Sequence, residues 1–424
     1  MLTAIVGINW GDEGKGRMVD LLSKDADIVV RYQGGNNAGH TVVNERGKFI
    51  LNLIPSGILR EDVVNVMGNG MVIDLKHLNE EIGRLQAGGI VITPNNLKIS
   101  NKASICMPYH VLMDCLEEDR LADKKFGSTR RGIAPVYADK YMKKNLRMSD
   151  LLYPETLESK LADIVEWKNI TVEGGYKHEA VSTKAILQWL TTYGEMLKPY
   201  ICDAGEFLNE SAKAGKEIIF EAQLGALRDI DFGIYPFTSS SSTISAYGPI
   251  GAGVPNHKIQ NTIGIMKAYS SCVGEGPFVC ELFGEDGEGL RNAGGEFGAA
   301  TGRPRRVGGF DIPASKYGCF VQGADELALT KLDILSTLEK IPVCVAYEID
   351  GVKRTDFPAN DELDKATPVV EYVKGWCSDI NWCRKPEDLP KEAIDYIKYI
   401  EQVVDCKIKY VSVGPEREAY ITMY

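Results

Sequence analysis

The chain has 424 residues, of which 44% are hydrophobic and 25% are charged, and these proportions are ordinary for a globular protein. The net charge of −11 excludes broad binding to nucleic acid or to an anionic membrane, because either partner calls for a basic surface. The length fits one large α/β domain with insertions or two domains, and no apolar stretch is long enough to span a bilayer.

A glycine-rich segment follows the first apolar run of the chain. Residues 2–6 are apolar, residues 7–16 read Gly-Ile-Asn-Trp-Gly-Asp-Glu-Gly-Lys-Gly, and an amphipathic run comes next. This order predicts a strand, a loop and a helix, and the loop can present backbone N–H groups and Lys15 to phosphate. The alternative is a tight turn with incidental glycines. Asp12 favours the phosphate site and indicates Mg²⁺, because a carboxylate beside phosphate is repelled unless a cation lies between them.

The loop differs from a standard P-loop at two positions. Asn9 lies where that pattern has its first glycine, and Gly16 lies where it has serine or threonine. A second strand is predicted over residues 27–32, and it ends in Gln-Gly-Gly-Asn-Asn-Ala-Gly-His-Thr at 33–41. Glycines and asparagine amides at a strand end are typical of a binding loop. We therefore interpret His40 as functional and the other four histidines as structural.

Further elements are predicted downstream. Residues 41–43 and 49–53 are predicted to flank a hairpin turn, residues 63–67 to form a strand, and Asp74 to cap a helix that runs to about Leu85. The segment 126–135 contains Ser-Thr-Arg-Arg-Gly, which is a weak anion-binding signal because basic turns are usually just solvated. Residues 148–215 are predicted to be mainly helical.

Three later segments carry polar side chains of interest. A buried strand over 217–220 leads into 221–231, and the hydroxyl run 238–243 fits either a flexible loop or a phosphate cradle. The segment 295–306 places three arginines within four positions after several glycines, which indicates a site for carboxylate or phosphate.

The strand that begins at Leu327 ends in Thr-Lys-x-Asp, and its aspartate suggests guanine recognition. One carboxylate can accept from the adjacent N1–H and N2–H₂ groups of guanine, whereas adenine would leave it unpaired. Lys331 can cover the ring with its alkyl stem, and residues 412–414, after the strand 407–411, can close the same pocket. An early phosphate loop and a late guanine loop together predict a GTP site.

Ten cysteines are scattered from Cys106 to Cys406 without a C-x-x-C pair. With no signal peptide at the start of the chain, this usage predicts reduced, mostly buried thiols in a cytoplasmic protein.

In motif order and along nearly its whole length, the chain resembles the adenylosuccinate synthetase family. The matching segments are 10–16, 31–40, Gly132-Ile with Pro135, 229–231, 235–236, 276–278, 301–303, 305–306, 329–333 and 412–415. The Trp-Gly-Asp-Glu-Gly-Lys-Gly loop is highly specific to that family.

The resemblance implies one α/β domain over 1–424, built on a large, mostly parallel sheet with flanking helices, P-loop-NTPase-like, with a helical insertion around 148–215. It also implies a cytoplasmic homodimer that uses GTP and Mg²⁺ to join IMP and L-aspartate through a 6-phosphoryl-IMP intermediate, releasing GDP and phosphate. This ligase of purine biosynthesis needs neither nucleic acid nor membrane.

The resemblance also implies residue roles. Asp12 is the base at the purine N1 and ligates Mg²⁺ with the Gly39 carbonyl, and His40 stabilises the transferred phosphoryl group. The GTP contacts are Gly11, Glu13, Gly14, Lys15, Gly16, Arg17, Gly39, Thr41, Arg305, Lys331, Leu332, Asp333, Ser412, Val413 and Gly414. The IMP contacts are Asn37, Ala38, Thr129, Lys143, Ser239 and Arg303. The aspartate contacts are Ala299, Ala300, Thr301, Gly302, Arg303 and Arg305.

Departures from the family pattern gather in the monophosphate pocket. Leu224 replaces a nucleotide-binding glutamine, Ser239 a threonine, and Lys143 an arginine that reaches the site from the partner subunit. Smaller departures are Ser242, Ala300 and Gly309. Two alternatives therefore stand beside the plain assignment: a paralogue that acts on another purine-type nucleotide or amine, and a non-catalytic GTP-binding relative. Intact Asp12, Lys15 and His40 argue against the second.

Overall fold

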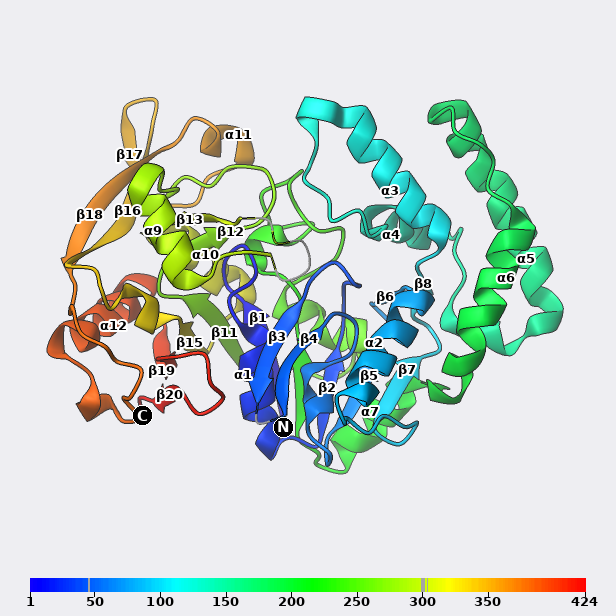
Figure 1. Ribbon diagram of the computed structural model, residues 1–424, viewed down its shortest axis with the longest axis horizontal. Helices are drawn as coiled ribbons and strands as arrows, with labels where there is room; N and C mark the ends of the chain where they lie inside the picture. The colour runs from blue at the N-terminus through cyan, green and yellow to red at the C-terminus, as the bar shows by residue number, and fades with distance from the viewer. Residues whose placement is uncertain (45, 299–301, 303) are drawn as a thin grey trace.

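The computed structural model describes residues 1–44, 46–298, 302 and 304–424. Its centre is a ten-stranded sheet of order β20-β19-β15-β11-β1-β10-β2-β5-β7-β9 (Figure 1). Neighbouring strands run parallel except for β20, which is antiparallel to β19. The strands are β1 (Leu2–Gly7), β2 (Ile28–Arg31), β5 (Val64–Met67), β7 (Leu97–Ser100), β9 (Ile201–Cys202), β10 (Ile218–Glu221), β11 (Asn261–Lys267), β15 (Glu326–Thr330), β19 (Lys407–Ser412) and β20 (Tyr420–Thr422). The predicted α/β fold around a large, mostly parallel sheet is confirmed.

The central strands are short apolar runs that are buried on both faces. Every residue of β1, β2 and β10 is buried, as expected for parallel strands covered by helices on two sides. The helices are α1 (Lys15–Leu22), α2 (Leu75–Ala87), α3 (Pro108–Leu121), α4 (Ile133–Met142), α5 (Pro154–Asn169), α6 (Thr183–Gly194), α7 (Ala204–Lys213), α8 (Gly248–Ala252), α9 (Gly284–Gly294), α10 (Ile312–Gln322), α11 (Asn360–Leu363) and α12 (Lys391–Val404).

Four smaller sheets accompany the central one in the described part of the chain. The strands are β3 (His40–Asn44) with β4 (Gly47–Leu51), β6 (Val72–Ile73) with β8 (Ser104–Ile105), β12 (Ser270–Cys272) with β13 (Arg306–Gly308), and a set of β14 (Phe310–Asp311), β16 (Lys340–Ile349), β17 (Val352–Arg354) and β18 (Thr367–Lys374). In Figure 1, α5 and α6 lie at one end of the molecule, and α12 and β18 lie at the other.

Several local predictions are confirmed. The predicted loop after β1 leads into the predicted helix, α1, and β3 and β4 form the predicted hairpin. Asp74 caps α2 by accepting a hydrogen bond from the backbone N–H of His77 at 3.1 Å. Residues 148–215 contain α5, α6 and α7, and also the short strand β9, which pairs with β7 in the central sheet. All ten cysteines are free thiols. None of the helices in the described part of the chain is long and apolar enough to cross a membrane.

Candidate active site

Four segments that carry predicted site residues follow strands on both sides of the point where the connectivity of the sheet reverses. From β1 the chain proceeds to β2, β5 and β7 on one side, and it later fills β11, β15 and β19 on the other. Ligands of open α/β sheets bind in the crevice outside the carboxyl ends of the strands at such a point. The phosphate loop follows β1, the His40 segment follows β2, Lys331 follows β15, and Val413 follows β19.

Glu13 holds the glycine-rich loop from inside. Its buried carboxylate accepts hydrogen bonds from the backbone N–H groups of Asn9 (3.1 Å) and Gly11 (2.8 Å) and pairs with the Lys15 ammonium at 2.6 Å. A Cβ on Gly7 would collide with the backbone carbonyl oxygen of Leu224 and would lie 2.6 Å from a Glu13 oxygen, which explains why the strand ends in glycine. These two N–H groups therefore face inward, and the free N–H groups of the first turn of α1 are left for phosphate.

His40 is oriented by Glu221, a residue that sequence reasoning did not assign to the site. The Nδ1 atom of His40 lies 2.5 Å from a Glu221 oxygen, and the same carboxylate accepts from the backbone and hydroxyl of Ser56 at 2.8 and 2.6 Å. Because a carboxylate only accepts, Nδ1 is the donor, and Nε2 is the ring atom left for a ligand.

The surroundings of this pair set its charge. Burial lowers the pKa of His40, although the Glu221 hydrogen bond opposes this shift. Burial alone would raise the pKa of Glu221, but its hydrogen bond with His40 and the charges around it outweigh burial and lower the pKa. The only sequence signal for Glu221 was its place at the end of a buried strand, because its partner His40 lies 181 positions away in the chain.

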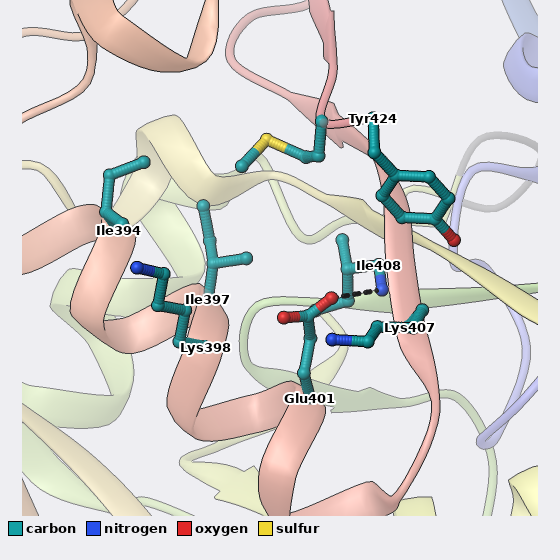
Figure 2. Close-up of a pocket in the computed structure, with 8 residues that line it drawn as sticks. Ile394, Ile397, Lys398, Glu401, Lys407, Ile408 and Tyr424 are labelled. Carbon is teal, nitrogen blue, oxygen red and sulfur yellow. Dashed lines mark hydrogen bonds between the residues drawn. The ribbon is translucent and has the colours of Figure 1, made fainter.

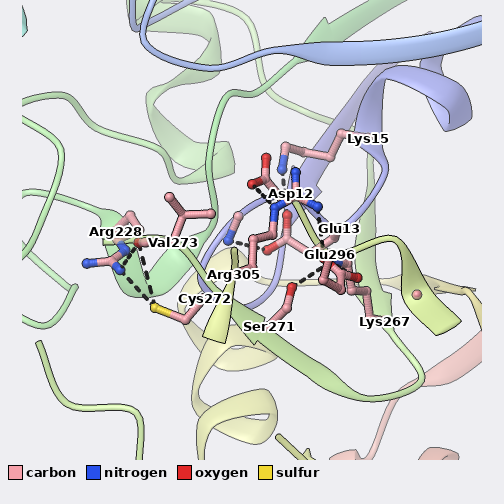
Figure 3. A network of polar contacts seen from close by, with 12 residues as sticks. Asp12, Glu13, Lys15, Arg228, Lys267, Ser271, Cys272, Val273, Glu296 and Arg305 are labelled. Carbon is pink, nitrogen blue, oxygen red and sulfur yellow. Dashed lines mark hydrogen bonds and ion pairs between the residues drawn. The ribbon is translucent and has the colours of Figure 1, made fainter. Parts of the chain in front are cut away.

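Asp12 and Arg305 form an ion pair across the site. The Asp12 carboxylate lies 3.1 Å from Nε of Arg305, and Nη1 of the same arginine lies 2.8 Å from Glu296 (Figure 3). Glu296 also pairs with Lys331 at 2.9 Å and with Lys267 at 2.8 Å. Burial alone would lower the pKa of Arg305, but Asp12 and Glu296 outweigh it and raise the pKa. The structure thus brings together the predicted base, an aspartate-site arginine and a guanine-site lysine.

Arg17 connects the phosphate loop to the guanine loop. From the first turn of α1, its guanidinium donates to the Ser412 hydroxyl and the Gly414 carbonyl, each at 2.5 Å, and to the Ala419 carbonyl at 2.9 Å. Burial raises the pKa of Asp333, which lies in the short 3-10 helix after β15. Leu332 and Val413 are buried and pack in the same hydrophobic cluster.

Three of the residues predicted to contact IMP are held by hydrogen bonds within the chain. Asn37 accepts from the Gly35 N–H at 3.2 Å, the Ala38 carbonyl accepts from Asn52 at 3.0 Å, and Ser239 is buried with its hydroxyl 3.2 Å from that of Ser241. Gly39 is half-buried before β3, and Thr41 is exposed within it.

The position of the missing glutamine is taken by Leu224. Leu224 is half-buried at a positive φ of 60°, against Gly11 of the phosphate loop. The neighbouring Gln223 already donates its amide to the carbonyls of Gly35 at 2.8 Å and Asn52 at 3.1 Å. The Gln223 amide nitrogen is therefore engaged in holding the 35–38 loop.

Thr129 and Lys143 lie beyond opposite ends of α4, and both are exposed. A ten-residue helix spans roughly 15 Å, so the two side chains of one chain are too far apart to share one phosphate. Two buried carboxylates of α3 hold the Thr129 loop: Asp114 accepts from Ser128 (2.7 Å) and Gly132 (2.8 Å), and Glu118 accepts from residues 126 and 127.

Several predicted contacts cannot be placed. Ala299, Ala300, Thr301 and Arg303 lie outside the described residues, and Gly302 is described with φ 65°. Within the described ranges, no cluster of three or more His, Cys, Asp or Glu side chains is arranged to hold a metal ion.

A cavity of about 390 Å³ lies apart from these loops, between α12, β19 and β20 (Figure 2). Its walls are mainly apolar and include Ile394, Ile397, Ile408 and Tyr424. It is lined by none of the predicted site residues, so the assignment of the site rests on the loops at the carboxyl ends of the strands.

The strand-end loops at this topological switch point carry a lysine beside glycines, a histidine oriented by a carboxylate and an arginine paired with Asp12. Together they define a nucleotide-dependent α/β enzyme. The family model described as adenylosuccinate synthetase matches residues 4–421. An adenylosuccinate synthetase of Caldanaerobacter subterraneus subsp. tengcongensis is 44% identical over 423 residues, covering 100% of this chain and 99% of the relative.

Solved structures agree with this match. A fully ligated adenylosuccinate synthetase from Plasmodium falciparum superposes with a TM-score of 0.93 at 35% identity, covering 100% of this chain and 99% of that one. A succinoaminodeoxyadenylate synthetase of cyanophage S-2L, bound to dGMP and dATP, has a TM-score of 0.60 at 16% identity over 99% of this chain and 95% of that one, and it shares the fold alone. The chain belongs to the adenylosuccinate synthetase family, whose members ligate IMP and aspartate using GTP in AMP biosynthesis.

Proposed function

We propose that this chain forms adenylosuccinate from IMP and L-aspartate and releases GDP and phosphate from GTP. The observation that carries the proposal is that Asp12 pairs with Arg305, while His40, oriented by Glu221, packs against Gly16 at the end of the loop that carries Asp12. A protein that only bound GTP would need neither a base nor an oriented imidazole.

In this proposal the reaction has two chemical steps. Asp12 takes the N1 proton of IMP, and O6 then attacks the γ-phosphorus of GTP, whose bond to the bridging oxygen breaks as GDP leaves. Phosphorylation turns O6 from a poor leaving group into a good one. The amine of aspartate then attacks C6 and displaces phosphate. Arg305 pairs with Asp12, and we propose that it binds a carboxylate of the incoming amino acid beside the reacting ring.

Two further groups act on the phosphoryl oxygens. Lys15, at the start of α1, supplies positive charge, and Nε2 of His40 faces the transferred group while Glu221 holds Nδ1. The negative charge of the phosphoryl oxygens favours the imidazolium form of His40, and Glu221 stabilises that form.

We also propose that Asp12 and the Gly39 carbonyl hold Mg²⁺. The Asp12 side chain is 28% exposed, so one of its oxygens remains open although the other pairs with Arg305. One carboxylate and one carbonyl suit Mg²⁺, which takes its remaining ligands from water and phosphate. When bound, the ion neutralises charge on the phosphates of GTP.

A homodimer is part of the same proposal. Lys143 is exposed beside Tyr141 and Met142, whose side chains are 74% and 52% exposed, and large apolar side chains together on a surface are typical of an interface. Since Lys143 lies far from Thr129 of its own chain, we propose that its ammonium group reaches the nucleotide phosphate in the partner subunit.

We treat 1–424 as one domain with a helical insertion around 148–215.

The test is GTP hydrolysis and adenylosuccinate formation with IMP and aspartate supplied together or omitted singly. Turnover that needs both supports the proposal. Turnover only with another purine nucleotide would overturn the assignment of IMP, and no turnover with any of them would overturn catalysis. Sedimentation analysis tests the dimer, which predicts a species of twice the 46.7 kDa chain mass.

A further inference from the structure

Glu296 lies at the centre of the polar network in Figure 3, and the reaction as described does not use it. Glu296 lies two residues after the end of α9 and directly before Phe297, which forms an isolated β-bridge with Pro304. Its side chain is fully buried. One oxygen accepts from Lys331 at 2.9 Å and Lys267 at 2.8 Å, and the other accepts from Lys267 at 2.9 Å and Arg305 at 2.8 Å.

These contacts form a continuous chain of charges between two parts of the site. Lys331 pairs with Glu296 at 2.9 Å, Glu296 with Arg305 at 2.8 Å, and Arg305 with Asp12 at 3.1 Å. The two ends are open to ligands, because Lys331 is 32% exposed and Asp12 is 28% exposed. The middle is closed, because Glu296 is 0% exposed and Arg305 is 12% exposed.

The surroundings keep Glu296 ionised. Burial alone would raise the pKa of its carboxyl group, but the charges of Lys267, Lys331 and Arg305 outweigh burial and lower the pKa. Burial lowers the pKa of Lys267 to about 8, although Glu296 opposes this shift. The carboxylate is thus a fixed charge that three cations share.

We propose that Glu296 is a positioning residue that couples guanine-nucleotide binding at Lys331 to the release of Asp12 from Arg305. This inference rests on the proposed function. When Lys331 turns onto the guanine ring, the Glu296 carboxylate loses one of its cations and attracts Arg305 more strongly. Arg305 then holds Asp12 less strongly, and the Asp12 carboxylate is free to meet the purine of IMP. By reciprocity, IMP bound at Asp12 favours guanine-nucleotide binding by the same factor.

The coupling factor is the quantity to measure. The dissociation constant of IMP is determined by titration calorimetry without nucleotide and with a saturating non-hydrolysable GTP analogue. In the wild-type protein we expect the analogue to tighten IMP binding about tenfold. In Glu296→Gln, which keeps the shape and removes the charge, we expect the factor to fall to about one. In Glu296→Asp, which keeps the charge on a shorter side chain, we expect an intermediate coupling factor.

The matched control is Glu281→Gln. Glu281 is a partly buried carboxylate that pairs with the neighbouring Arg306 at 2.6 Å and lies outside the chain of charges. We expect its coupling factor to equal that of the wild type. If Glu296→Gln does not fold, the double variant Glu296→Gln with Lys267→Met removes one buried charge of each sign, and the same loss of coupling is expected.

Two outcomes overturn the inference: a wild-type protein without coupling, and a folded Glu296 variant whose coupling factor equals that of the wild type. Both are distinguishable from failure of the proposed function, which would show as absence of adenylosuccinate formation by the wild-type protein.

Discussion

Gly16 and His40 touch so closely that a Cβ on residue 16 would lie 2.5 Å from the Cβ of His40. This contact packs the first turn of α1 against the start of β3, and it explains why the loop has glycine where a standard P-loop has serine or threonine. The space that a hydroxyl side chain would fill in a P-loop protein is occupied here by the proposed catalytic histidine.

Gly16→Ala is therefore expected to displace His40 and lower kcat about 100-fold while the protein remains folded. The control is Gly83→Ala in α2, where an added Cβ meets nothing within 4 Å. It should leave kcat unchanged and raise stability by about 0.5–1 kcal/mol. Steady-state kinetics measure kcat and thermal melts measure the stability of both variants. A wild-type kcat in Gly16→Ala would contradict the packing argument.

Glu221→Gln tests how His40 is oriented. A neutral amide can still accept from Nδ1 but no longer stabilises the imidazolium, so kcat should fall about 100-fold with little change in the KM for GTP. Because the carboxylate opposes the lowering of the His40 pKa by burial, its loss should lower that pKa further. Glu217→Gln, just before the other end of β10, is the control and should behave as wild type. Equal kcat values in all three proteins would refute the role.

Asp12→Ala is expected to abolish turnover while guanine-nucleotide binding stays within about tenfold, or roughly 1.4 kcal/mol. Arg305 keeps its 2.8 Å contact with Glu296 in this variant, so the site should remain assembled. Guanine-nucleotide affinity is measured by titration and turnover by adenylosuccinate formation. Asp25→Ala, at an exposed position, is the control. Substantial turnover by Asp12→Ala would show that the base lies elsewhere.

Asp311 gives a prediction for pH and stability. It is fully buried, it caps α10 and accepts from Tyr347 at 2.8 Å, and its other oxygen has no hydrogen-bond partner among the described residues. Burial raises its pKa from 3.8 to about 6. The folded protein therefore binds this proton more tightly than the unfolded chain, and the stabilisation present at low pH is lost as pH rises from 3.8 to about 6.

The expected loss is about 3 kcal/mol over that interval. Asp311→Asn keeps a capping oxygen and has no charge to bury, so the stability of this variant should not fall there. Urea unfolding at pH 4, 5, 6 and 7 is run on both proteins, and the difference between them isolates the residue from other titrating groups. A constant difference across the series would show that Asp311 is ionised throughout.

The local elements could be predicted from sequence because their signals are short-range. Apolar runs bounded by glycine predicted β1, β2 and β10. The cap at Asp74 predicted α2, and the turn residues predicted the β3–β4 hairpin. The family also followed from the sequence, since its motifs are contiguous and specific.

The partners of those contacts could not be predicted. His40 and Glu221 are 181 positions apart, and they meet because β10 enters the sheet between β1 and β2, late in the chain. Likewise, the glycine loop predicts a phosphate cradle. Only the fold shows that Glu13 accepts hydrogen bonds from two N–H groups of this loop and that Arg17 donates to Ser412 of the predicted guanine loop.

The sequence by itself thus determined many of the local elements and the family, because both depend on contiguous residues. The tertiary structure decided which charge faces which, as in the chain from Lys331 through Glu296 and Arg305 to Asp12. The physical reason is that pairing energies depend on distance and burial, and both are set by strand order, which brings together residues that are remote along the chain.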